Sequence, residues 1–192
     1  MSNQSESFSR IQILIFMGVT ALILLIIAQF WRELGAINLI PIRFNLEDFF
    51  LGVMIAIGIV GASSILSQIW EDYRRSAEAY LELIVTPLVF SDLIWLGLLP
   101  GLSEELLFRG VMIPALGYDL FAVIVSSILF GVLHLSNVQN WHYVVWAIIV
   151  GFVLGYSVYI TNNLFVPIIA HSLTNFFSSL MWKIKKRTTE AK

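Results

Sequence analysis

Residues 11–30 read IQILIFMGVTALILLIIAQF, and this run decides the fold of the chain. It contains no charged side chain, and its length matches the roughly 20 residues that a helix needs to cross a bilayer. Of the 192 residues, 58% are hydrophobic and only 12% are charged, which leaves too little polar surface to cover a soluble domain. The sequence therefore predicts an all-α, polytopic membrane protein.

Further apolar runs follow the first one, and together with it they predict six transmembrane helices. These runs cover residues 49–69, 92–114, 120–135, 143–160 and 164–182. Pro100 and Gly101 interrupt the third span, and because proline lacks the N–H that an inner helical turn uses, we expect a kink or a break there. In the broken form, Ser103 would cap the second half-helix.

Charged residues mark the parts of the chain that lie outside the hydrocarbon. Residues 71–82 are the most charged interior stretch and predict an amphipathic helix on the membrane surface. Eight Lys and Arg residues fall on the side of the two termini, whereas Arg32 and Arg43 fall on the other. Because cytoplasmic loops carry the excess of Lys and Arg, we expect both termini to be cytoplasmic and residues 183–192 to form a basic tail.

Composition also limits the partners and the chemistry. No basic stripe lies outside the tail, so membrane lipid is the expected partner and nucleic acid is not. The chain has no cysteine, which excludes a thiolate nucleophile and a thiolate metal site. The sequence does not predict an oligomeric state.

Three charged residues, Glu104, Glu105 and Arg109, lie inside the third apolar span. Each costs about 2.5 kcal/mol or more at bilayer depth, so a functional role is the first hypothesis. On a helix, Glu105 and Arg109 are spaced i,i+4 and face each other, which suits a bidentate ion pair. Glu104 is turned about 100° from Glu105 and is free to act on water or substrate. The alternative is a structural Glu-Arg pair with a spare glutamate.

Two histidines occupy later apolar runs. His134 follows Phe130 by four residues, so the two rings share one helix face, and His171 precedes Asn175 by the same spacing. Polar side chains aligned in a span point towards other helices, because outward they would meet lipid. The alternative is that each histidine is only a hydrogen-bonded part of the helix packing.

Such a set of residues suits the hydrolysis of an amide bond. A glutamate with a histidine can take a proton from water, and a second histidine with an asparagine amide can stabilise an oxyanion. Two histidines and one glutamate also form a common catalytic zinc set, although here the ligands would come from three different spans. The sequence alone leaves both mechanisms open.

Three short motifs occur in order on successive apolar segments. They are Glu-Glu-Leu-Leu-Phe-Arg at residues 104–109, Phe-Gly-Val-Leu-His at residues 130–134 and His-Ser-Leu-Thr-Asn at residues 171–175. This pattern resembles the CAAX protease and bacteriocin-processing family of intramembrane proteases, which is also called type II CAAX prenyl endopeptidase-like or Abi. The resemblance covers about residues 93–180, while the first two spans match only as generic membrane helices.

The resemblance implies a site and an activity. The implied catalytic residues are Glu104, His134, His171 and Asn175, and the implied supporting residues are Glu105, Arg109 and Phe130. The implied reaction is cleavage of peptide bonds within or beside the membrane, with prenylated CAAX proteins as the eukaryotic substrates. The mechanism is either metal-dependent, with Zn²⁺ held by Glu104, His134 and His171, or uses a water activated by glutamate without a metal, and we favour the second.

The resemblance also suggests how the chain is organised. Residues 1–90 form two spans and the interfacial segment, residues 91–182 form the catalytic core and residues 183–192 form the tail. A short six-span chain with a basic tail suggests a bacterial cell membrane. Rival interpretations are a non-catalytic immunity or scaffold protein of the same fold and, less favoured, a proton-linked transporter.

One geometric problem accompanies this assignment. His134 should lie near the inner end of its span, whereas Glu104 and His171 lie nearer the middle of theirs. A common site therefore requires a broken third helix, a tilted fourth helix or different span boundaries.

Overall fold

The computed structural model describes residues 8–190, and this part of the chain consists of helices and the loops that join them, with no strand. The predicted all-α fold is therefore confirmed. Residues 1–7 and the last two residues of the predicted tail, 191–192, lie outside the described range. The elements are α1 (Arg10–Leu34), α2 (Leu46–Ile69), α3 (Glu71–Val85), α4 (Asp92–Glu105), η1 (Leu106–Met112), α5 (Ile113–Ala115), α6 (Leu120–Val132), η2 (Val138–Asn140), α7 (Trp141–Thr161) and α8 (Phe165–Glu190).

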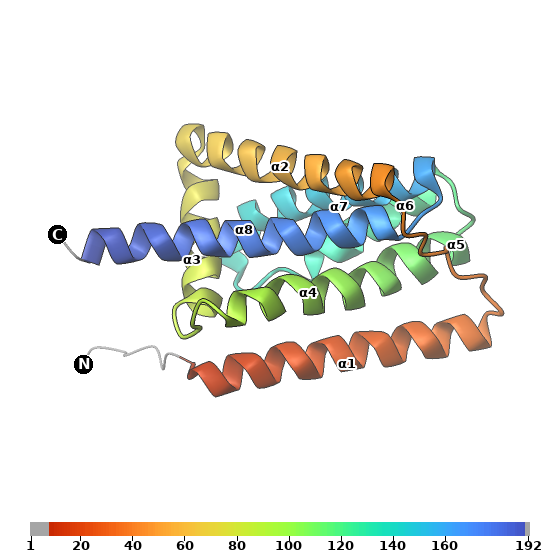
Figure 1. Cartoon of the computed structure of the whole chain (residues 1–192), viewed down its shortest axis with the longest axis horizontal. Helices are drawn as coiled ribbons and strands as arrows, with labels where there is room; N and C mark the ends of the chain where they lie inside the picture. The colour runs from red at the N-terminus through yellow and green to blue at the C-terminus, as the bar shows by residue number, and fades with distance from the viewer. Residues whose placement is uncertain (1–7, 191–192) are drawn as a thin grey trace.

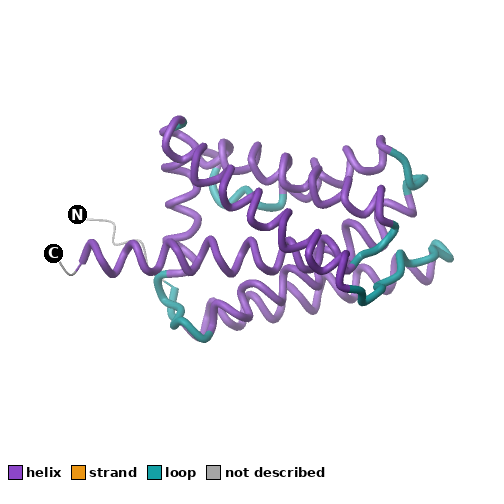
Figure 2. The backbone as a smooth tube through the Cα atoms, turned by 45° about the horizontal axis from the view of Figure 1, so that its top comes forward, coloured by secondary structure: helices purple, strands orange, loops and turns teal. Residues whose placement is uncertain are grey.

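The long helices lie side by side in a bundle, and α3 crosses their ends (Figure 1). Helix α8 runs through the bundle and packs against both α2 and α4, while α6 packs mainly against α7. The described chain begins and ends at the same end of the bundle as α3, and the tube view shows the same arrangement (Figure 2). An even number of passages along the bundle follows from this placement.

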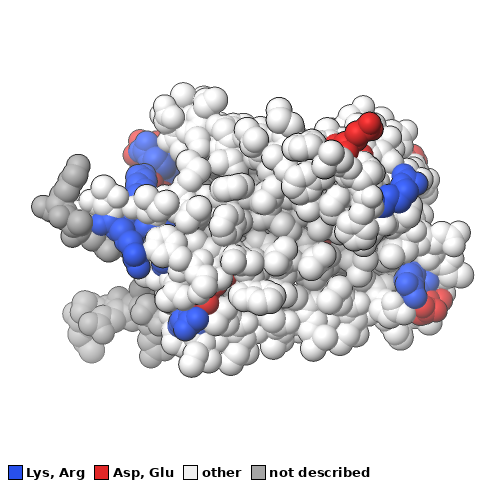
Figure 3. Space-filling model, viewed as in Figure 1, with Lys and Arg blue, Asp and Glu red and all other residues white. Residues whose placement is uncertain are grey.

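The composition of the helices agrees with a membrane protein. Helices α1 and α2 and the segment Val138–Thr161 are long and apolar enough to cross a bilayer, and α6 is a shorter apolar helix. On the face seen in Figure 3, charged side chains gather at the two ends of the bundle and the middle is uncharged. The six predicted runs coincide with α1, α2, the continuous segment α4–η1–α5, α6, α7 and α8. The number of spans and their orientation remain predictions.

The third span is one continuous helix at Pro100. Helix α4 continues through Pro100 to Glu105, and the Ser103 hydroxyl donates to the Leu99 carbonyl one turn earlier instead of capping a new helix. Of the two forms that the sequence left open, the break into two half-helices is therefore absent. The irregularity lies just beyond Glu105, where residues Leu106–Met112 form a π-helix. Such π segments are rare and occur frequently at functional sites.

Helices α4 and α8 approach each other closely because α4 presents glycines to α8. A Cβ atom added at Gly97 would lie 2.6 Å from the backbone oxygen of Ser172, and Gly101 faces the same residue one turn later. Small residues spaced in this way let two membrane helices pack at short range. This contact brings Glu104 on α4 and His171 on α8 to the same level of the bundle.

Replacing Gly97 by alanine should destabilise the protein by about 1–3 kcal/mol, because the new methyl group forces α4 and α8 apart. The free energy of unfolding in detergent micelles measures this effect. Gly58→Ala in α2 is the matched control, since nothing lies within 4 Å of a Cβ atom there. Equal stability of the two variants would contradict the close α4–α8 contact.

Helix α3 is anchored to the rest of the bundle on one face. Tyr73 and Ala77 are buried, and the Tyr73 hydroxyl lies 2.7 Å from that of Ser63 on α2. On its exposed face, Glu78 and Glu82 form ion pairs of 3.1 and 2.9 Å with Lys185 and Lys186 of α8, respectively. The amphipathic helix that residues 71–82 predict is therefore present, and it closes one end of the bundle.

Candidate active site

His134 lies in a turn after α6 and not within the helix. The sequence predicted an apolar run to residue 135, but α6 ends at Val132, and its 13 residues rise only about 20 Å. The helix thus stops inside the bundle. Of the three solutions to the depth problem, the structure shows a different helix boundary, which places His134 beside α4 and not at the inner end of a span.

The orientation of the His134 ring is fixed by its own chain. Its Nδ1 atom lies 2.8 Å from the carbonyl oxygen of Phe130. Because a carbonyl can only accept, Nδ1 carries the hydrogen and donates. The other ring nitrogen, Nε2, lies 3.9 Å from Oε2 of Glu104, too far for a direct hydrogen bond. The two side chains therefore face each other and are each about one sixth exposed.

Glu104 and Glu105 point to different surroundings, as the helical spacing predicted. The Oε2 atom of Glu104 is buried and has no hydrogen-bond partner among the described residues. Glu105 is fully buried, and its Oε1 accepts a hydrogen bond of 2.9 Å from Nη1 of Arg109. The predicted ion pair is thus present, but it is held by one such bond and not by two.

Glu105 also has a partner that the sequence did not predict. The same Oε1 atom accepts a 2.7 Å hydrogen bond from Nδ1 of His171 on α8. Arg109 in turn donates to the carbonyl of Gly151 on α7 at 2.9 Å, and its guanidinium lies 4.3 Å from the centre of the Phe130 ring. Glu105 therefore links the buried arginine to a histidine, in addition to pairing with Arg109.

Phe130 is the aromatic contact between these groups. Its ring centre lies 4.7 Å from that of His134 and 5.6 Å from that of His171. With Arg109 over its face, the ring contacts three of the polar side chains that the motifs supply. This packing fits the supporting role that the resemblance implies for Phe130.

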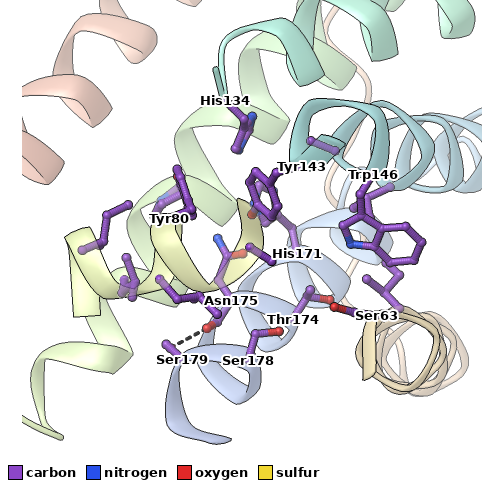
Figure 4. Close-up of a pocket in the computed structure, with 18 of the residues that line it drawn as sticks. Ser63, Tyr80, His134, Tyr143, Trp146, His171, Thr174, Asn175, Ser178 and Ser179 are labelled. Carbon is purple, nitrogen blue, oxygen red and sulfur yellow. Dashed lines mark hydrogen bonds between the residues drawn. The ribbon is translucent and has the colours of Figure 1, made fainter. Parts of the chain in front are cut away.

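The four predicted catalytic residues line one cavity of about 130 Å³ between α2, α3, α4, α7 and α8. Glu104 comes from α4, His134 from the turn after α6, and His171 and Asn175 from successive turns of α8. Figure 4 shows His134, His171 and Asn175 around the same space. The cavity is several times the space that one water needs, and its polar lining supplies hydrogen-bond partners for water.

Two tyrosines line the cavity that the sequence did not single out. Tyr80 of α3 and Tyr143 of α7 stack with ring centres 4.7 Å apart, and each ring centre lies 6.3 Å from that of His134 (Figure 4). Burial raises the pKa of Tyr80, and the nearby Glu104 carboxylate raises it further, so the phenol stays protonated. Tyr73, Ala77 and Tyr80 are spaced along one face of α3, and this spacing could have indicated from the sequence that Tyr80 faces the bundle.

The zinc set that the sequence left open is not formed by the side chains as they are placed. Among residues 8–190, no three His, Asp or Glu side chains lie close enough together to hold a metal ion. Glu104 and His134 approach each other, but the ring of His171 is tied through Nδ1 to Glu105. The predicted ligands Glu104, His134 and His171 therefore do not fit a shared zinc ion in this arrangement.

Comparisons with known proteins agree with the motifs. Residues 86–177 match the family described as Type II CAAX prenyl endopeptidase Rce1-like. The chain is also 28% identical over 127 residues to the uncharacterized protein YpbD of Bacillus subtilis (strain 168), a match that spans 66% of this chain and 65% of that relative. No solved structure gives a significant match. Residues 86–177 contain all three motifs, so the predicted resemblance is confirmed: this part of the chain is similar to the Rce1-like family of type II CAAX prenyl endopeptidases.

Proposed function

We propose that this protein is an endopeptidase that hydrolyses peptide bonds of membrane-associated proteins or peptides by means of a water activated by Glu104. The observation that carries the proposal is the pair of Glu104 Oε2 and His134 Nε2, which face each other at 3.9 Å on the wall of the cavity. The match of residues 86–177 to the type II CAAX prenyl endopeptidase Rce1-like family makes peptidase chemistry the first expectation.

The pair can hold a nucleophilic water. Since Nδ1 of His134 donates to Phe130, Nε2 of the neutral ring is an acceptor, and the Glu104 carboxylate is an acceptor as well. Two acceptors at this separation suit one water that donates a hydrogen bond to each. In the proposed reaction the water oxygen attacks the peptide carbonyl while Glu104 takes its proton, and Glu104 then gives that proton to the leaving amine.

His171 and Asn175 suit the opposite task, the stabilisation of the oxyanion. The carboxylate of Glu105 accepts from Nδ1 of His171 and fixes the orientation of the imidazole ring. A protonated His171 presents an Nε2–H donor, and the Asn175 amide supplies a second donor on the same helix. Both residues line the cavity, where low dielectric makes such hydrogen bonds strong.

The placement of the site suits substrates that are held in the membrane. Glu104 lies about 18 Å along α4 from its first residue, Asp92, which is close to the middle of a bilayer-spanning bundle. The end that carries α3 and the termini is the Lys- and Arg-rich end and faces the cytoplasm by the positive-inside rule. A bacterial cell membrane with both termini in the cytoplasm, and a prenylated or otherwise membrane-anchored substrate, belong to this proposal.

Cleavage of membrane-anchored peptides by the purified protein in liposomes should continue after complete removal of metal ions, because the proposed base is Glu104 and no metal takes part. The test presents a panel of such peptides before and after treatment with a chelator, with metal analysis of the same sample. No cleavage of any peptide would count against the peptidase. Cleavage that stops on chelation and returns with added zinc would overturn the metal-free mechanism.

A further inference from the structure

Two hollows meet at Glu104. One is the cavity of about 130 Å³ described above, and the other is a groove of about 270 Å³ between α1, α3 and α4. The residues that line both are Tyr80, Ile84, Leu96, Pro100 and Glu104, and Tyr80 carries the sole aromatic ring of this set. The proposed base is therefore reached from two sides, and one tyrosine ring forms part of both walls.

The groove has the chemistry of an apolar subsite. Its walls include Ile13, Phe16 and Met17 of α1 and Leu83 of α3. Phe16 and Leu83 are 50% and 42% exposed, so the groove opens at the outer surface of the bundle, where the helices expose apolar side chains. An apolar part of a substrate that arrives from the bilayer could lie in this groove with its backbone at Glu104.

The ring of Tyr80 is held in place between the two hollows. It stacks on Tyr143 at an interplanar angle of 24°. Its helix is fixed by the buried Tyr73 and by the ion pairs of Glu78 and Glu82 to α8. A ring that is packed on one side and carried by an anchored helix is a rigid wall, because side chains in packed interiors rarely leave their rotamers.

We infer that Tyr80 is a specificity-determining residue of the proposed peptidase, and that its ring limits how bulky a substrate residue beside the cleaved bond can be. This inference rests on the proposed function. A peptide bond that reaches Glu104 places its flanking residues in the cavity on one side and in the groove on the other. A bulky flanking residue on the side of Tyr80 meets the ring, whereas a small one does not.

The test uses a membrane-anchored peptide that the wild-type protein cleaves, with alanine or tryptophan placed in turn at each of the two residues that flank the cleaved bond. In Tyr80→Ala, the ratio of kcat/KM for tryptophan to that for alanine should rise about tenfold or more at one of these positions, a size typical of a changed apolar pocket. Tyr80→Leu, which keeps apolar packing on α3, should show a smaller rise in the same direction.

Two control variants separate the ring from other effects. Tyr80→Phe keeps the ring and should keep the wild-type ratio. Leu81→Ala removes a neighbouring side chain that lines the cavity but not the groove, and it should also keep the wild-type ratio. Ratios for Tyr80→Ala and Tyr80→Leu within threefold of wild type at both positions would overturn the inference, while cleavage itself would still support the proposed function.

A binding measurement keeps the two proposals distinguishable. In a Glu104→Gln background, the dissociation constants of the same peptides do not depend on cleavage. Tyr80→Ala should improve the binding of the tryptophan peptide about tenfold relative to the alanine peptide. An unchanged ratio of dissociation constants would overturn the role of Tyr80 even where cleavage itself is observed, whereas failure of the wild-type protein to cleave any membrane-anchored peptide would overturn the proposed peptidase.

Discussion

Glu104→Gln should lower kcat for peptide cleavage about 10²- to 10⁴-fold, the usual contribution of a general base. The amide keeps the size of the carboxylate, but it cannot take a proton from the water. Because the side chain does not support other residues through hydrogen bonds, the fold should remain intact. Steady-state cleavage of a membrane-anchored peptide in liposomes measures the change, and the thermal unfolding of both proteins confirms that they are equally folded.

Glu78→Gln is the matched control for this substitution. Glu78 is exposed on α3 and pairs with Lys185 at the surface, so its loss should leave cleavage close to the wild-type rate. His134→Ala should fall between the two variants, because it removes one of the two acceptors for the water and leaves the base. A Glu104→Gln protein that cleaves within tenfold of wild type would show that the base has been assigned to the wrong residue.

Local patterns predicted the parts of this site that lie close together in the chain. The i,i+4 spacing predicted the contact between Glu105 and Arg109 and the separation of Glu104 from both. In the structure Arg109 donates to Glu105, while Glu104 lines the cavity. By contrast, the hydrogen bond from His171 to Glu105 joins residues 66 positions apart. Such a contact depends on how α4 and α8 pack, and no pattern within a single helix encodes it.

The helix boundaries show a second limit of the sequence. Leu133 and Leu135 extend an apolar run, so hydropathy continues the helix past His134, yet the chain turns at Leu133 and His134. Hydropathy reports how strongly a segment prefers lipid or the protein interior to water. It does not distinguish a helix from a turn that is covered by other helices. Pro100 left both a kinked helix and a break open, and the helix continues because a helix in a bundle can lose one hydrogen bond without ending.

No pattern in the sequence marks the π-helix. Residues Leu106–Met112 include Gly110, which lowers helix propensity, but nothing in their order marks a change from i→i+4 to i→i+5 hydrogen bonds. The change occurs where Arg109 must reach Glu105, the carbonyl of Gly151 and the face of Phe130 together. The position of that one guanidinium is therefore central to the geometry of the site.

Arg109→Met should destabilise the protein by about 3–5 kcal/mol, because it leaves the carboxylate of Glu105 buried without its cationic partner. Both side chains are completely inaccessible to solvent, so water cannot replace the lost hydrogen bond of 2.9 Å. The same substitution removes the donor to Gly151 and the cation over Phe130. Unfolding in mixed micelles of increasing denaturant content measures the difference in free energy.

Two further variants decide whether the buried charge is the cause. Glu105→Leu combined with Arg109→Met should recover much of the lost stability, because replacing both members of a buried ion pair by apolar side chains is often neutral or stabilising. Arg75→Met removes an exposed partner of Glu71 on α3 and should have a far smaller effect, since solvent screens that pair. The double variant should nevertheless cleave poorly, because His171 then lacks the hydrogen bond to Glu105 that fixes its ring. Full stability of Arg109→Met would show that the buried Glu105 does not depend on Arg109 as a partner, and the proposed cost of the unpaired carboxylate would have to be abandoned.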